Sequence, residues 1–176
     1  MVGNSLTFDG LGHYKEEGLG LELLAESAGV DLTYGFHVRC GSTLSDTLAN
    51  PTDICIPAPF QYGKFSNALP NYDWDAVTLQ PHVGSTLGQD AATCATFIDL
   101  AKTHPGNDDT AFYIYSAWPA QSTGKYAEYW VGNLHEDDGL PSQQRRQYVD
   151  HLFKRVEGEN DALLRLIPAG EGFYRL

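Results

Sequence analysis

The chain alternates between short apolar runs and longer segments in which apolar residues recur every three or four positions. The short runs have the length and the β-branched and aromatic content of buried strands, and turn-forming residues lie between them. They cover residues 32–38, 76–79, 111–115 and 163–167. The pattern therefore predicts a strand at each of these places.

The longer segments have the spacing of amphipathic helices, in which one face is apolar. The first is expected to end at Gly29, because glycine favours the position just after a helix, and the second to stop before Pro105. A third is expected to begin near residues 141–142. Their apolar faces consist of Leu19, Leu23, Leu24 and Ala28 in the first helix, Ala91, Cys94, Ala95, Ile98 and Ala101 in the second, and Tyr148, Val149, Leu152, Phe153 and Val156 in the third.

The order of these elements predicts the fold class. Strands separated by helices of this length need crossover connections, so the sheet is expected to be mostly parallel and covered on both faces. The sequence thus predicts an α/β fold, a three-layer α/β/α sandwich of the flavodoxin-like kind. No internal repeat or change of composition marks a linker, so residues 1–176 are expected to form a single domain.

Composition and charge exclude several kinds of partner. The 176 residues include 11 Lys and Arg against 23 Asp and Glu, which gives a formal net charge of -12. Such a surface repels phosphate backbones and anionic lipid, so a nucleic-acid partner is not expected. No run approaches the roughly 20 apolar residues of a membrane span. Residues 1–5 do not resemble an export leader, and both a cytoplasmic and a secreted or periplasmic location stay open.

The cysteines do not have the spacing of a metal site. Cys40, Cys55 and Cys94 lie far apart, and no Cys-x-x-Cys pair is present. No metal or cofactor is therefore expected. Cys94 falls in a helical pattern and is interpreted as a small core residue. Cys40 and Cys55 flank a loop-rich segment and could form a disulfide in an oxidising compartment, although the odd number of cysteines argues against a disulfide scaffold.

The candidate site lies in the turns after the strands. In a parallel sheet, ligands bind beyond the carboxyl ends of the strands. Gly3, shortly before Ser5, lets the chain turn sharply and expose a hydroxyl, although Ser5 could equally be a helix N-cap. The same edge offers the N–H of Gly41 to an oxyanion, and the polar pair Gln80 and His82 follows the strand at 76–79.

These turns resemble motifs of the SGNH hydrolases, also called GDSL-like esterases and lipases, an α/β/α superfamily. Residues 3–7 (Gly-Asn-Ser-Leu-Thr) are similar to the family's first block, with Asn4 where Asp is usual. Residues 39–44 resemble the second block, and residues 72–80 resemble the third. The resemblance implies an ester-hydrolysing enzyme with no cofactor and a small-molecule ester as substrate.

The resemblance also implies roles for individual residues. Ser5 would be the nucleophile, and the N–H groups of Ser5 and Gly41 would form an oxyanion hole. The family's third donor is an Asn, and here Gln80 or His82 stands in its place. Apart from the resemblance, Asn4 and Trp118 are candidates for substrate contact; Trp118 follows the strand at 111–115, at the expected active-site edge, although it could instead be structural cover for a loop.

The family's fourth block, an Asp-x-x-His that supplies the general base, does not occur in this sequence. This block normally follows the last strand, and only Met1 and Val2 precede Gly3 where a first strand is expected, so we expect the chain to be trimmed at both ends. Among the histidines, His82 is the best placed to replace the base, and His135 is a weaker candidate. The others, His13, His37, His104 and His151, are interpreted as ordinary surface or edge residues.

Three hypotheses follow from the sequence. The first is an SGNH-type serine esterase that acts on a carboxylic ester such as an acylated carbohydrate, through an acyl-enzyme on Ser5. The second is a catalytically inactive SGNH-like domain that binds a carbohydrate or a protein partner. The third is a fragment that folds only with a missing segment or with a second copy, as an oligomer, because an unpaired first-strand position would leave an exposed sheet edge.

Overall fold

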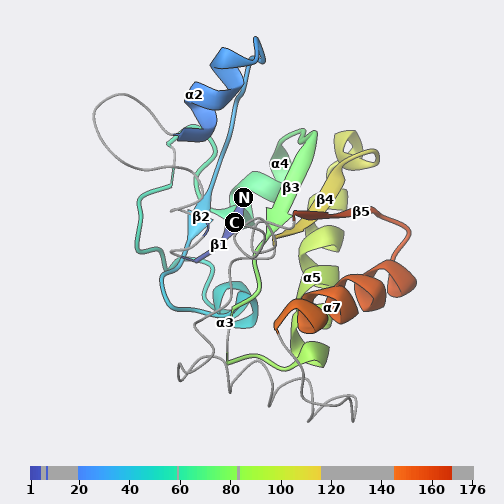
Figure 1. The fold of residues 1–176 in the computed structure, drawn as a ribbon. Coiled ribbons are helices and arrows are strands. Elements are labelled where there is room, and N and C mark those ends of the chain that lie inside the picture. Colours follow the sequence, from blue (N-terminus) through green and yellow to red (C-terminus); the bar gives the residue numbers. More distant parts are fainter. Residues whose placement is uncertain (5–6, 8–19, 59, 83, 116–144, 168–176) are drawn as a thin grey trace, which may run out of the picture.

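The fold is built on a five-stranded sheet in which every neighbouring pair is parallel, with the order β2-β1-β3-β4-β5 (Figure 1). A computed structural model describes residues 1–4, 7, 20–58, 60–82, 84–115 and 145–167. The strands are β1 (Val2–Gly3), β2 (His37–Val38), β3 (Ala76–Leu79), β4 (Ala111–Tyr115) and β5 (Leu163–Ile167). This order is the flavodoxin-like one, which confirms the predicted α/β class and is compatible with a three-layer α/β/α sandwich.

The described helices pack mainly around one long central helix, α5 (Leu87–Lys102). It contacts α3 (Leu44–Ala49), α4 (Phe65–Asn71) and α7 (Arg145–Glu159), and Figure 1 shows α5 and α7 side by side next to the strands. A short 3₁₀ helix, η1 (Pro105–Asn107), follows α5. A capping box of Thr86 and Gln89 begins α5 by satisfying the first free N–H groups.

The hydrophobic core lies between the sheet and this group of helices. Alternate residues of the central strands point into it, because successive side chains of a strand lie on opposite faces. Its fully buried large side chains are Tyr148, Phe97, Phe112, Leu44, Leu79, Leu87, Ile98, Ile114 and Leu152. Cys94 is buried there as a free thiol, as predicted. Burial raises its pKa well above the ordinary value, which keeps the thiol protonated.

The strands predicted at 76–79, 111–115 and 163–167 are confirmed with the same bounds. The strand predicted at 32–38 is too long, because only His37 and Val38 form a strand. Their partner β1 has two residues, so it offers hydrogen bonds to two residues only. Before them, a β-carbon on Gly35 would lie 3.2 Å from both the Tyr62 and the Trp74 rings, so this part of the chain packs against aromatic side chains.

The first predicted helix is confirmed as α2 (Gly20–Ser27), and Gly29 follows it with a φ of 69°. Its apolar face, however, is not buried. Leu23 is 45% exposed and Leu24 is 67% exposed. Figure 1 shows the reason, since α2 lies away from the sheet and from the helices around α5. The amphipathic pattern therefore predicted the helix correctly, but the helix does not pack its apolar face against the core.

The loops at the amino ends of the strands are joined by one buried side chain, Asn107. It accepts hydrogen bonds from the N–H of Trp74 (2.8 Å) and the hydroxyl of Thr110 (3.2 Å). Its amide nitrogen lies within hydrogen-bond distance of three carbonyl oxygens, those of Leu69, Tyr72 and Ala101. Asn107 thus connects η1, the end of α4 and the chain leading into β3.

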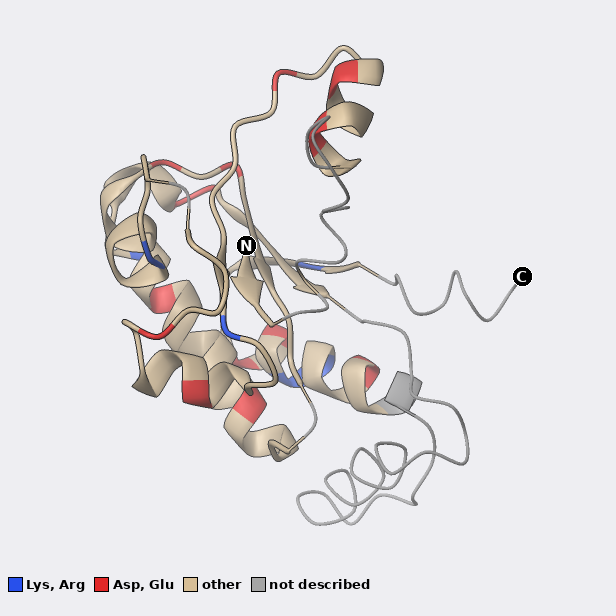
Figure 2. Ribbon diagram, turned by 90° about the vertical axis from the view of Figure 1, so that its left-hand side faces the viewer, with Lys and Arg blue, Asp and Glu red and all other residues tan. Residues whose placement is uncertain are grey.

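Acidic residues are distributed over helices and loops, with few Lys and Arg between them (Figure 2). Ion pairs such as Arg39 with Asp53 at 3.7 Å and Arg155 with Glu159 at 3.4 Å lie at the surface. Pairs of this kind contribute about 0–1 kcal/mol each. The buried core therefore contributes far more to stability than these surface charges do.

Candidate functional site

The turns that follow β1, β2 and β3 lie side by side at the carboxyl edge of the sheet. The N–H of Arg39 donates to the carbonyl of Gly3 (3.0 Å), which joins the end of β2 to the end of β1. On the other side, the N–H of Gln80 donates to the carbonyl of Val2 (3.1 Å). Because β1 lies between β2 and β3, the first turn has the second and third turns as its neighbours.

The first turn begins with buried residues. Asn4 has no exposed surface, and its carbonyl accepts a hydrogen bond from the N–H of Thr7 (3.0 Å). Thr7 is also buried. Ser5, the predicted nucleophile, lies outside the described residues, as does Trp118. Asn4 and Thr7, the described residues on either side of Ser5 in sequence, are therefore both buried and bonded to each other.

Gly3 is the point where the first and third turns meet most closely. A β-carbon on Gly3 would lie 3.0 Å from the Cβ atoms of both Gln80 and Thr7, and it would collide with the Thr7 hydroxyl. Only glycine leaves room for these two side chains above the strand. The Thr7 hydroxyl uses this space to donate a hydrogen bond to Oε1 of Gln80.

Gln80 is placed where the sequence predicted it, directly after β3, and is fully buried. Its Oε1 is bonded to Thr7, whereas its Nε2 has no hydrogen-bond partner among the described residues. A buried polar group left without a partner costs about 1–3 kcal/mol. An unpaired amide of this kind is a feature that a functional site would explain. His82 follows two residues later and is half-buried.

The second turn exposes Gly41. The N–H of Ser42 bonds to the carbonyl of Arg39 (3.4 Å), and Gly41 lies within this turn with a φ of 62°, a conformation that favours glycine. No hydrogen bond in the described part of the chain uses the Gly41 N–H. Thr43 then begins α3 as its N-cap and accepts from the N–H of Asp46 (3.0 Å). The Gly41 amide is therefore available to a ligand or to water.

The second and third turns also approach each other. Gly84, in the loop after His82, has a φ of 100°. A β-carbon there would lie 3.8 Å from the methyl group of Thr43, at the start of α3. The loop that contains Gln80 and His82 therefore returns toward the turn that contains Gly41.

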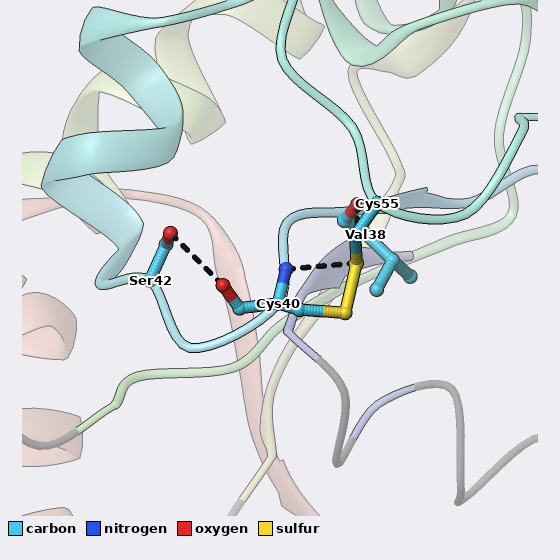
Figure 3. The surroundings of a disulfide bond; sticks show 4 residues. All are labelled: Val38, Cys40, Ser42 and Cys55. Atoms are coloured by element: carbon cyan, nitrogen blue, oxygen red, sulfur yellow. Dashed lines mark hydrogen bonds between the residues drawn. A yellow bond between two sulfur atoms is a disulfide. The ribbon is translucent and has the colours of Figure 1, made fainter.

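A disulfide holds the second turn in place (Figure 3). The sequence leaves the pairing of Cys40 and Cys55 open, and the structure joins them, with 5.7 Å between their Cα atoms. The N–H of Cys55 donates to the carbonyl of Val38 (3.0 Å), and Ile56 forms an antiparallel bridge with Val38. The segment around Cys55 thus covers the edge strand β2 and anchors the turn next to Gly41.

Of the histidines in the described part of the chain, His82 alone lies at this edge. His104 lies before β4, at the opposite edge, where its Nδ1 is 3.0 Å from Oδ1 of Asp73. His151 is half-buried on α7. His13 and His135 lie outside the described residues.

The interpretation of His37 as a surface or edge residue is half wrong. The residue does lie on the edge strand β2, but it is 1% exposed. Its ring packs edge-on against Phe65 at 4.8 Å between ring centroids, and its Nδ1 accepts from the N–H of Phe65 (3.4 Å). Burial lowers the pKa of His37 to about 4, an effect that Lys64 strengthens. His37 is therefore a neutral core residue at neutral pH.

The described residues contain no group of three or more His, Cys, Asp or Glu side chains that could hold a metal ion. Within the same residues, no helix has both the length and the hydropathy of a membrane span. The polar groups that the described residues place at this edge include backbone N–H groups and the side chains of Asn4, Thr7, Gln80 and His82.

Sequence reasoning missed Thr7. It belongs to residues 3–7, which resemble the first family block, but the resemblance assigns it no role. The sequence signal for a role of Thr7 is its place two positions after the candidate nucleophile. Its contact with Gln80 is visible only in the structure.

Comparisons with known proteins do not identify a family for this chain. No protein-family model, no curated protein and no solved structure matches this chain. The resemblance to SGNH hydrolases therefore stays a prediction from the sequence motifs.

Proposed function

We propose that this chain is a serine esterase of the SGNH type, which hydrolyses a carboxylic ester such as an acylated carbohydrate through an acyl-enzyme on Ser5. The observation that supports the proposal is the meeting of three turns at one edge of the sheet. The ends of β1 and β2 are joined through Gly3 and Arg39, and those of β1 and β3 through Val2 and Gln80. Residues from distant parts of the sequence can act there on one ligand.

The reaction would proceed in two steps. The Ser5 hydroxyl attacks the carbonyl carbon of the ester while a base takes its proton, and the alcohol leaves with a proton to give an acyl-enzyme. Water then attacks the acyl-enzyme, releases the carboxylic acid and restores Ser5. The negative charge on the carbonyl oxygen in both steps needs preorganised donors, which are the N–H of Ser5 and Gly41 and the side-chain amide of Gln80.

The free Gly41 N–H and the unpartnered Nε2 of Gln80 support these roles, since both are donors without a partner in the described part of the chain. Removal of one such donor typically lowers kcat about 100-fold to 1,000-fold. His82, at the same edge, is the described histidine that could act as the base or as a further donor.

The experiment that tests the function is hydrolysis of p-nitrophenyl acetate by the wild-type chain and by Ser5→Ala, together with labelling by a fluorophosphonate probe. We expect hydrolysis and labelling in the wild type and loss of both in Ser5→Ala. Hydrolysis that persists in Ser5→Ala would refute the esterase assignment, as would a failure of the wild type to hydrolyse ester and to be labelled.

Histidine variants make a matched control. His82→Ala removes a group at the carboxyl edge, whereas His104→Ala removes one at the opposite edge. We expect His82→Ala to lower the rate at least 10-fold and His104→Ala to change it less than 2-fold. Binding of acylated carbohydrate without turnover in the wild type would favour the alternative, a non-catalytic SGNH-like binding domain.

A further inference from the structure

The two ends of the Gln80 side-chain amide differ in their hydrogen bonding. Oε1 accepts the Thr7 hydroxyl, and Nε2 has no partner among the described residues although the side chain is fully buried. A side-chain amide can rotate by half a turn and exchange these two ends. Its hydrogen bonds therefore decide whether it offers N–H donors or a carbonyl acceptor to a ligand.

Thr7 is held firmly in position against the Gln80 amide, and its hydroxyl donates to Oε1 in the observed orientation. It is 2% exposed, and its N–H donates to the carbonyl of Asn4 at 3.0 Å. Gly3 allows it to lie directly against Gln80, because a β-carbon at Gly3 would be 3.0 Å from the Cβ atoms of both residues. Threonine also loses little freedom here, since its branched side chain has few rotamers to begin with.

We propose that Thr7 is a positioning residue that anchors the Gln80 side-chain amide through Oε1, so that Nε2 faces the carbonyl oxygen of the substrate. The role rests on the proposed esterase function, because it needs a developing oxyanion to act on. In the rotated amide, Oε1 would face the oxyanion and repel it. Thr7 itself touches neither the substrate nor the reacting atoms.

The test compares Thr7→Val, which keeps the shape and removes the hydroxyl, with Thr7→Ser, which keeps the hydroxyl. We expect Thr7→Val to lower kcat for p-nitrophenyl acetate 10-fold to 100-fold with KM changed less than 3-fold, because the donor acts in the transition state. Thr7→Ser should keep at least a third of the wild-type kcat. Thr93→Val, a buried threonine of α5 that bonds to the Gln89 carbonyl (2.7 Å), is the matched control and should change kcat less than 2-fold.

A double-mutant cycle then asks whether Thr7 acts through Gln80. In a Gln80→Leu background, Thr7→Val should lower kcat less than 2-fold further, since the amide that it orients is absent. Equal kcat values for Thr7→Val and Thr7→Ser would overturn the proposal. So would full additivity in the cycle, or a rise in KM with kcat unchanged.

A second readout separates this proposal from the proposed function. In ¹H–¹⁵N spectra, the side-chain NH₂ signals of Gln80 are identified by their loss in Gln80→Leu. We expect Thr7→Val to shift or split these signals and Thr7→Ser to leave them near their wild-type positions. Without Ser5-dependent hydrolysis in the wild type, the esterase function fails while shifted signals still support the orienting role. Unchanged signals in Thr7→Val overturn that role whatever the activity.

Discussion

Replacement of Asn107 by Asp is the perturbation for which the structure allows the most detailed prediction. The side chain is fully buried, and the substitution keeps its shape while replacing the NH₂ group by an oxygen. That NH₂ group faces the carbonyl oxygens of Leu69 (3.3 Å), Tyr72 (3.0 Å) and Ala101 (2.9 Å). A carboxylate at this place would point negative charge at three acceptors and lack any donor for them.

The size of the effect follows from two contributions. The NH₂ group has two hydrogens, and the loss of two hydrogen bonds costs about 2 kcal/mol at about 1 kcal/mol each. The buried carboxyl must also be protonated, which at pH 7 and an unfolded pKa of about 3.9 costs up to about 4 kcal/mol. The protonated acid recovers one donor, so we expect Asn107→Asp to lower the free energy of unfolding by about 4–5 kcal/mol at pH 7.

The loss of stability in Asn107→Asp should depend on pH in a defined direction. The variant carboxyl has a folded-state pKa above its unfolded one, so the folded state binds more protons and the variant gains stability as pH falls. Between pH 7 and 5.5 the protonation cost decreases by about 2 kcal/mol. The difference in the free energy of unfolding between the wild type and Asn107→Asp should decrease by that amount, whereas the difference between the wild type and Asn107→Ala should stay constant.

Urea denaturation followed by tryptophan fluorescence at both pH values measures these deficits. Asn71→Asp is the matched control, because Asn71 is an exposed asparagine whose amide bonds to the Asn67 carbonyl (2.8 Å). It should cost less than about 1 kcal/mol at either pH. The reasoning is refuted by an Asn107→Asp variant within about 1 kcal/mol of the wild type at pH 7, or by a deficit that does not change with pH.

Two further predictions concern His37 and the disulfide. The pKa of His37 lies near 4 in the folded state, below the ordinary value of 6.5 that it has in the unfolded chain, so the unfolded chain takes up the proton first as pH falls. The wild type should therefore lose about 2 kcal/mol of stability between pH 8 and 5 that His37→Phe does not lose, as measured by urea denaturation, and parallel curves for the two proteins would contradict this. The bond between Cys40 and Cys55 closes a loop with a sequence separation of 15, so the double Cys→Ser variant should be about 3 kcal/mol less stable. Thiol titration should find no reactive cysteine in the native chain and one, Cys94, after unfolding without reductant, and a reactive thiol before unfolding would contradict the bond.

The strands that the sequence predicted correctly are those that are paired along their whole length. Residues 111–115 have β3 on one side and β5 on the other, so the apolar run and the strand have the same bounds. The run at 32–38 is also rich in β-branched and aromatic residues, but its partner β1 ends after two residues. The extent of a strand depends on its neighbour, and the local pattern does not contain that information.

Short helices escaped prediction for a different reason. Helix α3 has six residues, fewer than an apolar period needs to be recognised, and its start depends on the bond from Asp46 to Thr43. Helix α4 contains Pro70, which in a sequence indicates a helix end. Here Pro70 lies in the last turn, and the burial of Phe65 and Leu69 in the core stabilises the helix around it.

The location of the candidate site could be predicted because it follows from topology. In a parallel sheet the residues after each strand share one edge, so Asn4, Gly41 and Gln80 are expected there without any contact being known. The bond between Thr7 and Gln80 could not be predicted, since the two residues are 73 positions apart and their contact depends on the missing side chain of Gly3.

Gly3 connects the stability of the fold with the proposed chemistry. It ends β1, which lies between β2 and β3, and it pairs with Val38 of β2, while Val2 before it pairs with both neighbouring strands. The same position must stay free of a side chain for Thr7 to reach Gln80. A larger residue at position 3 would therefore separate the first turn from the third and break the contact between Thr7 and the Gln80 amide. The glycine before the candidate nucleophile is thus required by the contact between two turns, in addition to any sharp bend of the backbone.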